Sequence, residues 1–310
     1  MCRYRLAHHM MNKRTFEPMN LGFNVSIAYF AKLNSSAVIG GYSMKLAAYI
    51  ENVRQKKPLV HHITNYVTVN DCANGCLAIG ASPVMADAID EVEEMVAISA
   101  ALVLNIGTLN VTKVESMMAA GRKANALGIP VIFDPVGCGA TPFRNRMAQE
   151  LMDNVHMSVV RGNISEILSL GGEQVQTKGV DAGEADEKVA VTVAKTLAKH
   201  WNTVVVISGA IDIVTDGGHV IYIKNGCPEM SAITGSGCMC TSLIGAFCGA
   251  NPEHILEAAA AAMMTMGISG ERAWKSYGAQ GLGHFHMGLI DELGHMDAET
   301  LEKEASYEEA

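Results

Sequence analysis

A glycine-rich turn at residues 234–238, Thr-Gly-Ser-Gly-Cys, carries the residue types best suited to chemistry in this sequence, and we expect a helix over Met239–Ala250 after it. Glycines let successive backbone N–H groups point to one side, and the positive end of a helix adds to them, so the turn can hold an anion. Cys238 lies in the first turn of the expected helix, where the helix dipole would lower the pKa of its thiol from about 8.5. We therefore expect Cys238 to accept a proton from a hydroxyl beside the anion. The alternative is a buried structural cysteine.

Two further segments place charged residues where predicted strands end. Asp134 closes the apolar run Pro130–Asp134 and can help to hold Mg²⁺ through water. Arg161 closes another strand and is followed by Asn163 and Glu166. An arginine suits phosphate, and an acid near a metal would serve phosphoryl transfer. The spacing Asn163-x-x-Glu166 is also that of a helix capping box.

Several weaker candidates accompany these segments. Asn65 follows a short strand and can cap a helix or bind a substrate hydroxyl, and Met85 lies in an expected loop where it can line an apolar pocket. Ser208 ends a strand where a hydroxyl can meet a nucleotide. His284-x-His286 lacks the further ligands that a metal site needs. The chain has neither a P-loop nor a GxGxxG dinucleotide motif at the glycine-rich turn.

The elements that must position these residues alternate between strands and helices from residue 45 onward. We expect strands over Pro58–Ile63, Leu102–Gly107, Pro130–Asp134, Met157–Arg161 and Thr203–Gly209, followed by a hairpin turning at Gly217-Gly218. We expect helices over residues 65–79, 87–101, 112–128 with a capping box at Thr112-x-x-Glu115, 163–170, 185–200 and 237–299. The alternation predicts an α/β fold with a central, mostly parallel sheet flanked by helices on both faces. In such sheets ligands bind beyond the carboxyl ends of the strands.

Composition excludes several classes of protein. The 310 residues are 49% hydrophobic and 18% charged, which is enough for a large core, and no apolar run is long enough to span a bilayer. A net charge of −9 disfavours nucleic acid as a partner. The eight cysteines lack zinc spacing and are expected to be reduced thiols in a cytoplasmic enzyme.

The chain is expected to have one main domain over residues 44–303. Residues 1–43 are basic and acid-poor, and we expect a poorly ordered extension or an over-long start there, with a targeting segment or a functional arm as the alternatives. Residues 304–310 form an acidic tail that is expected to fray.

Taken together, the ordered segments resemble the hydroxyethylthiazole kinase family of the ribokinase-like superfamily. The resemblance covers roughly residues 44–303 and is carried by HHITNYVTVNDCANGCLAIGASPVMADA, LVLNIGTL, PVIFDPVGCGAT, VVRGNISEI, VVVISGAIDIV and AITGSGCMCTSLIGAF. Related kinases place an aspartate base in the last of these turns. This family places a cysteine there, and Cys238 matches.

The resemblance implies ATP-dependent phosphorylation of the hydroxyl of 4-methyl-5-(2-hydroxyethyl)thiazole in thiamine salvage, with Mg²⁺. It also implies a ribokinase-like fold and a homotrimer with active sites between subunits. The residue roles that it implies are Cys238 as base, Met85, Gly235 and Asn65 for the substrate, Arg161, Ser208 and Gly237 for ATP, and Asp134 and Glu166 for the metal. The alternatives are a kinase of another vitamin-precursor alcohol, of the hydroxymethylpyrimidine or pyridoxal type, and a nucleotide-dependent dehydratase-like relative.

Overall fold

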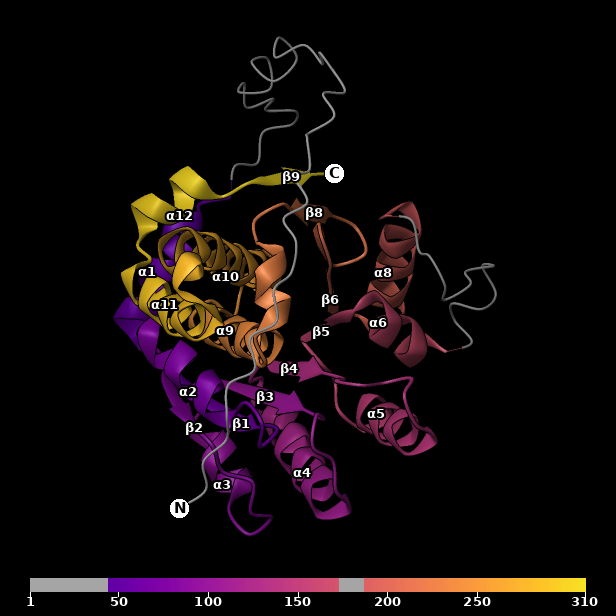
Figure 1. Cartoon of the computed structure of the whole chain (residues 1–310). Helices are drawn as coiled ribbons and strands as arrows, with labels where there is room; N and C mark the ends of the chain where they lie inside the picture. The colour runs from indigo at the N-terminus through magenta and orange to yellow at the C-terminus, as the bar shows by residue number, and fades with distance from the viewer. Residues whose placement is uncertain (1–43, 173–186) are drawn as a thin grey trace, which may run out of the picture. The chain divides into compact units, whose positions relative to one another are not determined.

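Within the residues that the structure describes, nine strands form a single central sheet (Figure 1). The computed structural model describes residues 44–172 and 187–310, and Met44–Ala310 forms one compact unit. The strands are β1 (Leu59–Ile63), β2 (Ser82–Val84), β3 (Ala101–Asn105), β4 (Val131–Asp134), β5 (Val159–Asn163), β6 (Val204–Ser208), β7 (Asp212–Thr215), β8 (Val220–Ile223) and β9 (Tyr307–Glu309). Their order across the sheet is β2-β1-β3-β4-β5-β6-β7-β8-β9.

The sheet is parallel from β2 to β6 and antiparallel from β7 to β9. This confirms the predicted, mostly parallel sheet and the hairpin between β7 and β8. Because parallel strands run in one direction, the carboxyl ends of β1, β3, β4, β5 and β6 lie along the same edge of the sheet. The ligand site is expected at that edge.

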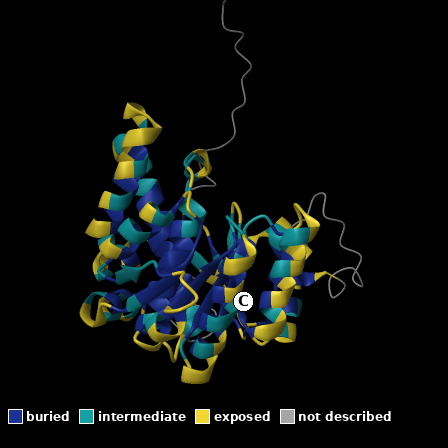
Figure 2. Ribbon diagram, turned by 90° about the horizontal axis from the view of Figure 1, so that it is seen from below, coloured by how far each residue is buried: buried dark blue, intermediate teal, exposed yellow. Residues whose placement is uncertain are grey.

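Helices cover both faces of the sheet (Figures 1 and 2). One face packs against α1 (Leu46–Lys56), α2 (Val69–Ala78), α9 (Ser236–Ala250), α10 (Ile255–Tyr277), α11 (Leu282–His295) and α12 (Ala298–Glu304). The other packs against α3 (Val92–Ala97), α4 (Val111–Leu127), α5 (Pro142–Asn154), α6 (Ile164–Gly171) and α8 (Glu187–Trp201). Short 3-10 turns, Pro228–Ala232 and Gly278–Gln280, lie before α9 and α11.

Strand β3 shows why the sheet needs helices on both sides. All of its residues are buried. Val103 belongs to the core on the α9 side, whereas Leu102 and Leu104 belong to the core on the α4 side. A strand with apolar residues on both faces is stable only when both faces are covered. The continuous apolar run in the sequence therefore reflects its central position.

Both edges of the sheet differ from the prediction. Ser82–Val84, expected as part of a loop, forms β2 beside β1. The acidic tail, for which the sequence predicts fraying, instead contributes β9, which pairs antiparallel with β8. Lys224, which directly follows β8, forms an ion pair with Glu308 of β9. These edge strands are held mainly by backbone hydrogen bonds, so they lack the apolar pattern that marks the central strands.

The helices also differ in detail from the prediction. Helices α1 and α5 were not predicted, and α3 is shorter than the expected helix over residues 87–101. The expected capping box at Thr112 is wrong, because α4 is capped by Asn110, which accepts a 2.8 Å hydrogen bond from the Lys113 N–H. The predictions for residues 1–43, and for the start of α8 at residue 185, lie outside the described residues. Among the described helices, none is long and apolar enough to cross a membrane.

Candidate active site

The glycine-rich turn reaches the carboxyl edge of the sheet through α9, which packs across β1, β3 and β4. Gly235 has a φ of 89°, a left-handed conformation that favours glycine. A Cβ at Gly235 would lie 2.9 Å from Thr68 Cγ2 and 3.2 Å from Asp71 Oδ2. The turn therefore needs glycine for its backbone conformation and for its close approach to the start of α2.

The first turn of α9 provides an anion site. Its N-cap is Gly235, and no side chain of the described residues caps it. The free N–H groups of this turn, including that of Gly237, need an acceptor, and the positive end of the helix favours an anion. Arg161 Nη1 lies so close that a Cβ at Gly237 would be 2.8 Å from it.

Arg161 has further capacity to bind an anion. Its Nη2 donates to Ser208 Oγ at 3.1 Å. Its Nε is buried and has no hydrogen-bond partner among the described residues. An unpaired guanidinium N–H beside an uncapped helix start fits a phosphate group. The structure thus brings Arg161, Ser208 and Gly237 together.

A cavity of about 540 Å³ opens beside this anion site. Arg161, Ser208 and Gly237 lie on one side of it, and Cys240, Met263 and Met266 supply an apolar wall. Its volume is in the range of roughly 300–1,000 Å³ typical of small-molecule sites. The cavity therefore has room for a small molecule beside the anion site.

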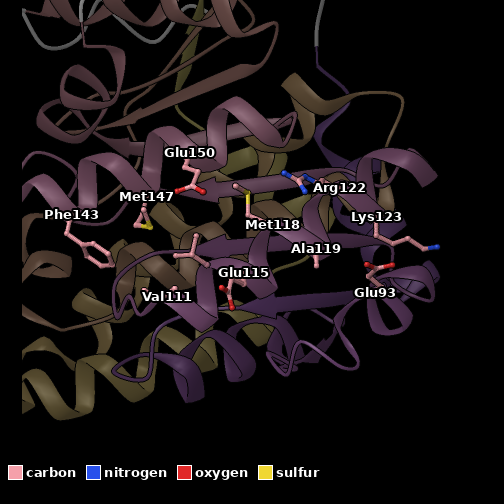
Figure 3. Close-up of a pocket in the computed structure, with 11 residues that line it drawn as sticks. Glu93, Val111, Glu115, Met118, Ala119, Arg122, Lys123, Phe143, Met147 and Glu150 are labelled. Atoms are coloured by element: carbon pink, nitrogen blue, oxygen red, sulfur yellow. The ribbon is translucent and has the colours of Figure 1, made fainter.

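A larger hollow of about 680 Å³ lies elsewhere, among α3, α4 and α5 (Figure 3). Met118, Met147 and Phe143 form its apolar part, and Glu115 and Arg122 lie at its rim. None of the predicted site residues lines it. Size alone would favour this hollow, but the chemistry favours the smaller cavity beside Arg161.

The Cys238 sulfur is half-buried and accepts hydrogen bonds from two amide groups. Asn65 Nδ2 lies 3.2 Å from Sγ, and Asn105 Nδ2 lies 3.3 Å from it. Burial raises the pKa of the Cys238 thiol, and the Asp134 carboxylate raises it further, while hydrogen bonds from Thr68, Asn65 and Asn105 oppose the rise. The predicted lowering of this pKa is therefore wrong, because the neighbouring acid and burial outweigh the helix start.

Asp134 is fully buried behind the sulfur. Its Oδ2 accepts hydrogen bonds from Asn105 Nδ2 and Thr241 Oγ1, both at 2.8 Å. Burial raises the pKa of Asp134 to about 6, against the lowering effect of the Arg161 charge. At pH 7 the carboxylate is therefore mainly ionised.

Glu166 lies near Asp134, and both of its carboxylate oxygens accept hydrogen bonds from backbone N–H groups. Its Oε1 accepts from the Gly137 N–H and its Oε2 from the Asn163 N–H, each at 2.9 Å. The capping box with Asn163 is complete, so this alternative from the sequence is confirmed. Among the described residues, no group of three or more His, Cys, Asp or Glu side chains could enclose a metal. Asp134 and Glu166 fit only a Mg²⁺ that is held largely by water and phosphate oxygens.

The two remaining substrate candidates lie differently. Asn65 joins the sulfur site, but its amide N–H groups are directed to Cys238 and to Asn105 Oδ1, the latter at 3.0 Å. Met85 follows β2, which β1 and β3 separate from β4. At about 4.8 Å between strands, β2 lies about 14 Å from the strand of Asp134. Met85 is therefore separated from Asp134, while β1, which pairs with β2, leads directly to Asn65 beside Cys238.

Sequence reasoning missed the residues that connect the site. Asn105 bridges Cys238 and Asp134, and Thr241 supports Asp134 from α9. Arg144 of α5 donates to the carbonyl groups of Ile106 and Val136. Asn105 ends a buried strand, as Asp134 does, and that position was the available signal. His286 Nε2 lies 3.1 Å from Asp71 Oδ1, behind the Gly235 turn rather than in a metal site.

Comparisons with known proteins identify the family of this chain. The sequence profile of the Hydroxyethylthiazole kinase family matches residues 50–299, most of the chain. The chain belongs to this family. The hydroxyethylthiazole kinase of Ruminiclostridium cellulolyticum is 49% identical over 270 residues, covering 86% of this chain and 98% of the relative. The hydroxyethylthiazole kinase of Clostridium beijerinckii is 51% identical over 265 residues, covering 84% of this chain and 96% of the relative.

Solved structures show the same membership and fold. A hydroxyethylthiazole kinase protein from Pyrococcus horikoshii matches with a TM-score of 0.79 and 38% identity, covering 86% of this chain and 98% of that one. A ribokinase-like superfamily protein from Enterococcus faecalis matches with a TM-score of 0.58 and 14% identity, covering 83% of this chain and 89% of that one. The second likeness supports the fold alone. The hydroxyethylthiazole kinase family member described here therefore has the expected ribokinase-like architecture.

Proposed function

We propose that this enzyme transfers the terminal phosphoryl group of ATP to the hydroxyl of 4-methyl-5-(2-hydroxyethyl)thiazole, in thiamine salvage. The observation that carries the proposal is the position of the Cys238 sulfur. It lies at the start of α9, beside the anion site, and accepts two amide hydrogen bonds. The family membership names the chemistry, and the curated relatives are named for this thiazole alcohol.

The residues divide the reaction between binding and proton transfer. The backbone N–H groups at Gly235–Cys238 and the Arg161 guanidinium hold phosphate, while Ser208 orients Arg161 at 3.1 Å. Cys238 accepts the proton of the attacking hydroxyl. Phosphoryl transfer depends mainly on positioning and charge stabilisation, so the base contributes a modest share of the rate.

Asp134 and Glu166 would hold Mg²⁺ through water. When bound, the ion neutralises charge on the phosphate oxygens. Asp134 supplies an ionised carboxylate near neutral pH, since its pKa is raised only to about 6. Its side chain is buried, so we propose that it contacts the ion through bound water molecules rather than directly.

We also propose that the enzyme is a homotrimer whose active sites lie between subunits. Met85 is relevant to this proposal because it follows the edge strand β2 and the family resemblance assigns it to the thiazole. Exposed Tyr66 and Val67, beside Asn65, offer an apolar surface that a second subunit could cover. ATP use and the unpaired thiols of the described residues support a cytoplasmic location.

The test is alcohol-dependent ADP formation by the purified chain with ATP and Mg²⁺. The alcohols are the thiazole, hydroxymethylpyrimidine and pyridoxal, and phosphorylated product is identified by mass spectrometry. We expect the thiazole to give the highest kcat/KM. A higher value for either other alcohol would reassign the substrate, and ADP formation without a phosphorylated alcohol would favour the dehydratase-like alternative.

A further inference from the structure

Asn105 uses its whole amide group within the site. Its Nδ2 donates to Asp134 Oδ2 at 2.8 Å and to Cys238 Sγ at 3.3 Å. Its Oδ1 accepts from the Gly107 N–H at 2.9 Å and from Asn65 Nδ2 at 3.0 Å. An asparagine amide has two N–H donors and one oxygen with two lone pairs. All four positions are therefore occupied, in a side chain that is only 1% exposed.

The orientation of this amide follows from its backbone partner. The Gly107 N–H can only donate, so the atom that it meets on Asn105 must be the oxygen. The nitrogen must then face Asp134 and Cys238. The in-register pairing of Asn105 with Asp134 across β3 and β4 sets the distance between them.

The Asn65 amide is oriented by the same logic. Its Oδ1 accepts from the N–H groups of Val67 and Thr68, both at 3.1 Å. Its nitrogen must then face Asn105 and Cys238. Two amides on different strand ends are thus locked with one N–H each directed at the same sulfur. Hydrogen bonds donated to a group favour its negatively charged form.

We propose that Asn105 is a positioning residue that holds the Cys238 sulfur as a hydrogen-bond acceptor and ties it to the Asp134 carboxylate. This inference rests on the proposed function, in which Cys238 accepts the proton of the alcohol. The Asn105 N–H groups stabilise negative charge on both neighbours at once. They allow a thiolate and a carboxylate to lie close together, where they would otherwise repel each other.

The charged and titratable groups around the sulfur come from several elements. Cys72 lies on α2, Asp134 on β4 and Arg161 on β5, and each interacts electrostatically with Cys238. Glu166 on α6 interacts with Asp134. Of these neighbours, Arg161 alone favours the thiolate. Removing the Asn105 N–H groups therefore leaves the sulfur with fewer groups that stabilise its charge.

The test replaces Asn105 by aspartate, which has nearly the same shape. Asn105→Asp keeps an oxygen for Gly107 and Asn65 but loses both N–H donors. The matched control is Asn251→Asp, at the other end of α9, where the buried amide contacts Tyr49 and Phe247 carbonyl groups. Each protein is alkylated with iodoacetamide over a range of pH, and a Cys238→Ala version of each is subtracted to remove other thiols such as Cys227.

We expect the midpoint of Cys238 alkylation to move upward by about one pH unit or more in Asn105→Asp, so that the rate near neutral pH falls about tenfold. The midpoint should not move in Asn251→Asp. The alkaline rise of kcat should shift by the same amount, with KM for ATP changed less than about threefold. An unchanged alkylation midpoint in folded Asn105→Asp would overturn the proposal.

A second variant at the same position gives a result even where Asn105→Asp does not fold. Asn105→Ser retains one short donor and carries no added charge, and its alkylation midpoint should also move upward. Thr241→Val removes only the second hydrogen bond to Asp134, so it should move the midpoint less than either Asn105 variant. Equal shifts in Thr241→Val and Asn105→Ser would assign the effect to Asp134 alone and contradict the bridge. The alkylation assay needs no substrate. An inactive wild type would therefore reject the proposed function without affecting the alkylation test of Asn105.

Discussion

Cys238 combines two features that oppose each other at the scale of the residue. Asn65 and Asn105 donate hydrogen bonds to its sulfur, which favours the thiolate. Burial and the Asp134 charge nevertheless raise the pKa of the thiol. In the free enzyme Cys238 is therefore mainly a thiol at neutral pH. A thiol base becomes more effective as the pH rises toward its pKa.

Replacing Cys238 by alanine should lower kcat by a factor on the order of 10²–10⁴, because the proposed base is lost. The affinity for ATP should stay within a few-fold, since backbone N–H groups and Arg161 are the groups proposed to hold the phosphates. The measurement is kcat against pH, where wild type should rise toward alkaline pH and the variant should not. Cys248→Ala, which removes a buried thiol at the far end of α9, is the control. A Cys238→Ala enzyme with normal turnover would rule out the base.

Gly235 tests whether the shape of the turn matters. Gly235→Ala should lower kcat/KM at least about tenfold, because small displacements of catalytic groups are costly. The added Cβ would meet Thr68 Cγ2 at 2.9 Å and push the start of α9 away. Gly128→Ala is the matched control, since Gly128 has a left-handed φ of 70° but open space around its missing Cβ. Each left-handed alanine costs about 1–2 kcal/mol of stability. Similar kcat/KM losses in both variants would attribute the effect to backbone strain alone.

At the scale of elements, Arg144 links the loops that follow β3 and β4. Its Nη1 donates to the carbonyl groups of Ile106 and Val136, both at 2.7 Å, and its Nη2 to that of Gly107 at 2.8 Å. Asn105 and Asp134 directly precede these loops. The N-terminal turn of α5 thus holds the loops that directly follow Asn105 and Asp134, the two side chains nearest to Cys238 on β3 and β4.

Replacing Arg144 by methionine should remove these hydrogen bonds while keeping much of the side-chain volume. We expect a loss of stability on the order of 3 kcal/mol, because buried carbonyl groups lose a charged donor. The activity of the folded protein should fall as well. It is measured as kcat, calculated from the concentration of folded enzyme. Arg146→Met is the control, since Arg146 is exposed on the same helix. Equal stability of the two variants in urea would contradict the link.

At the scale of the whole molecule, the buried Asp134 couples folding to pH. Its pKa is raised from 3.8 to about 6 by burial, so the folded protein binds this proton more tightly than the unfolded chain does. The contribution of this group to stability is therefore greatest below pH 3.8 and is lost as the pH rises through about 6. His62 acts in the opposite direction, because burial lowers its pKa to about 4.

Comparing wild type with Asp134→Asn isolates the acid from the histidine. Between about pH 4 and about pH 7, the free energy of unfolding of the variant should rise relative to wild type by up to about 3 kcal/mol. Titrating groups that do not interact with Asp134 cancel in this difference. Urea unfolding at several pH values measures it. A difference that stays constant across that range would show that the carboxyl has an ordinary pKa in the folded protein.

The central fold could be predicted because its strands are recognisable locally. The buried runs of β3, β4 and β6 are apolar on both faces, as strands covered by helices must be. The edge strands could not be predicted in this way. β9 is acidic and pairs through its backbone with β8, so nothing in its composition marks it as a strand.

The sequence by itself determined which groups are proposed for the chemistry of this enzyme, namely the glycine-rich turn, Cys238, Asp134 and Arg161. Their roles depend on local features, namely a turn that needs glycine, a helix start and charged residues at strand ends. Only the tertiary structure decided how they act on one another. Asn105 and Cys238 are 133 residues apart, and so are joined only when α9 packs across β3. The direction of the Cys238 pKa was likewise decided by folding, because burial and the charge of Asp134 exist only in the folded chain.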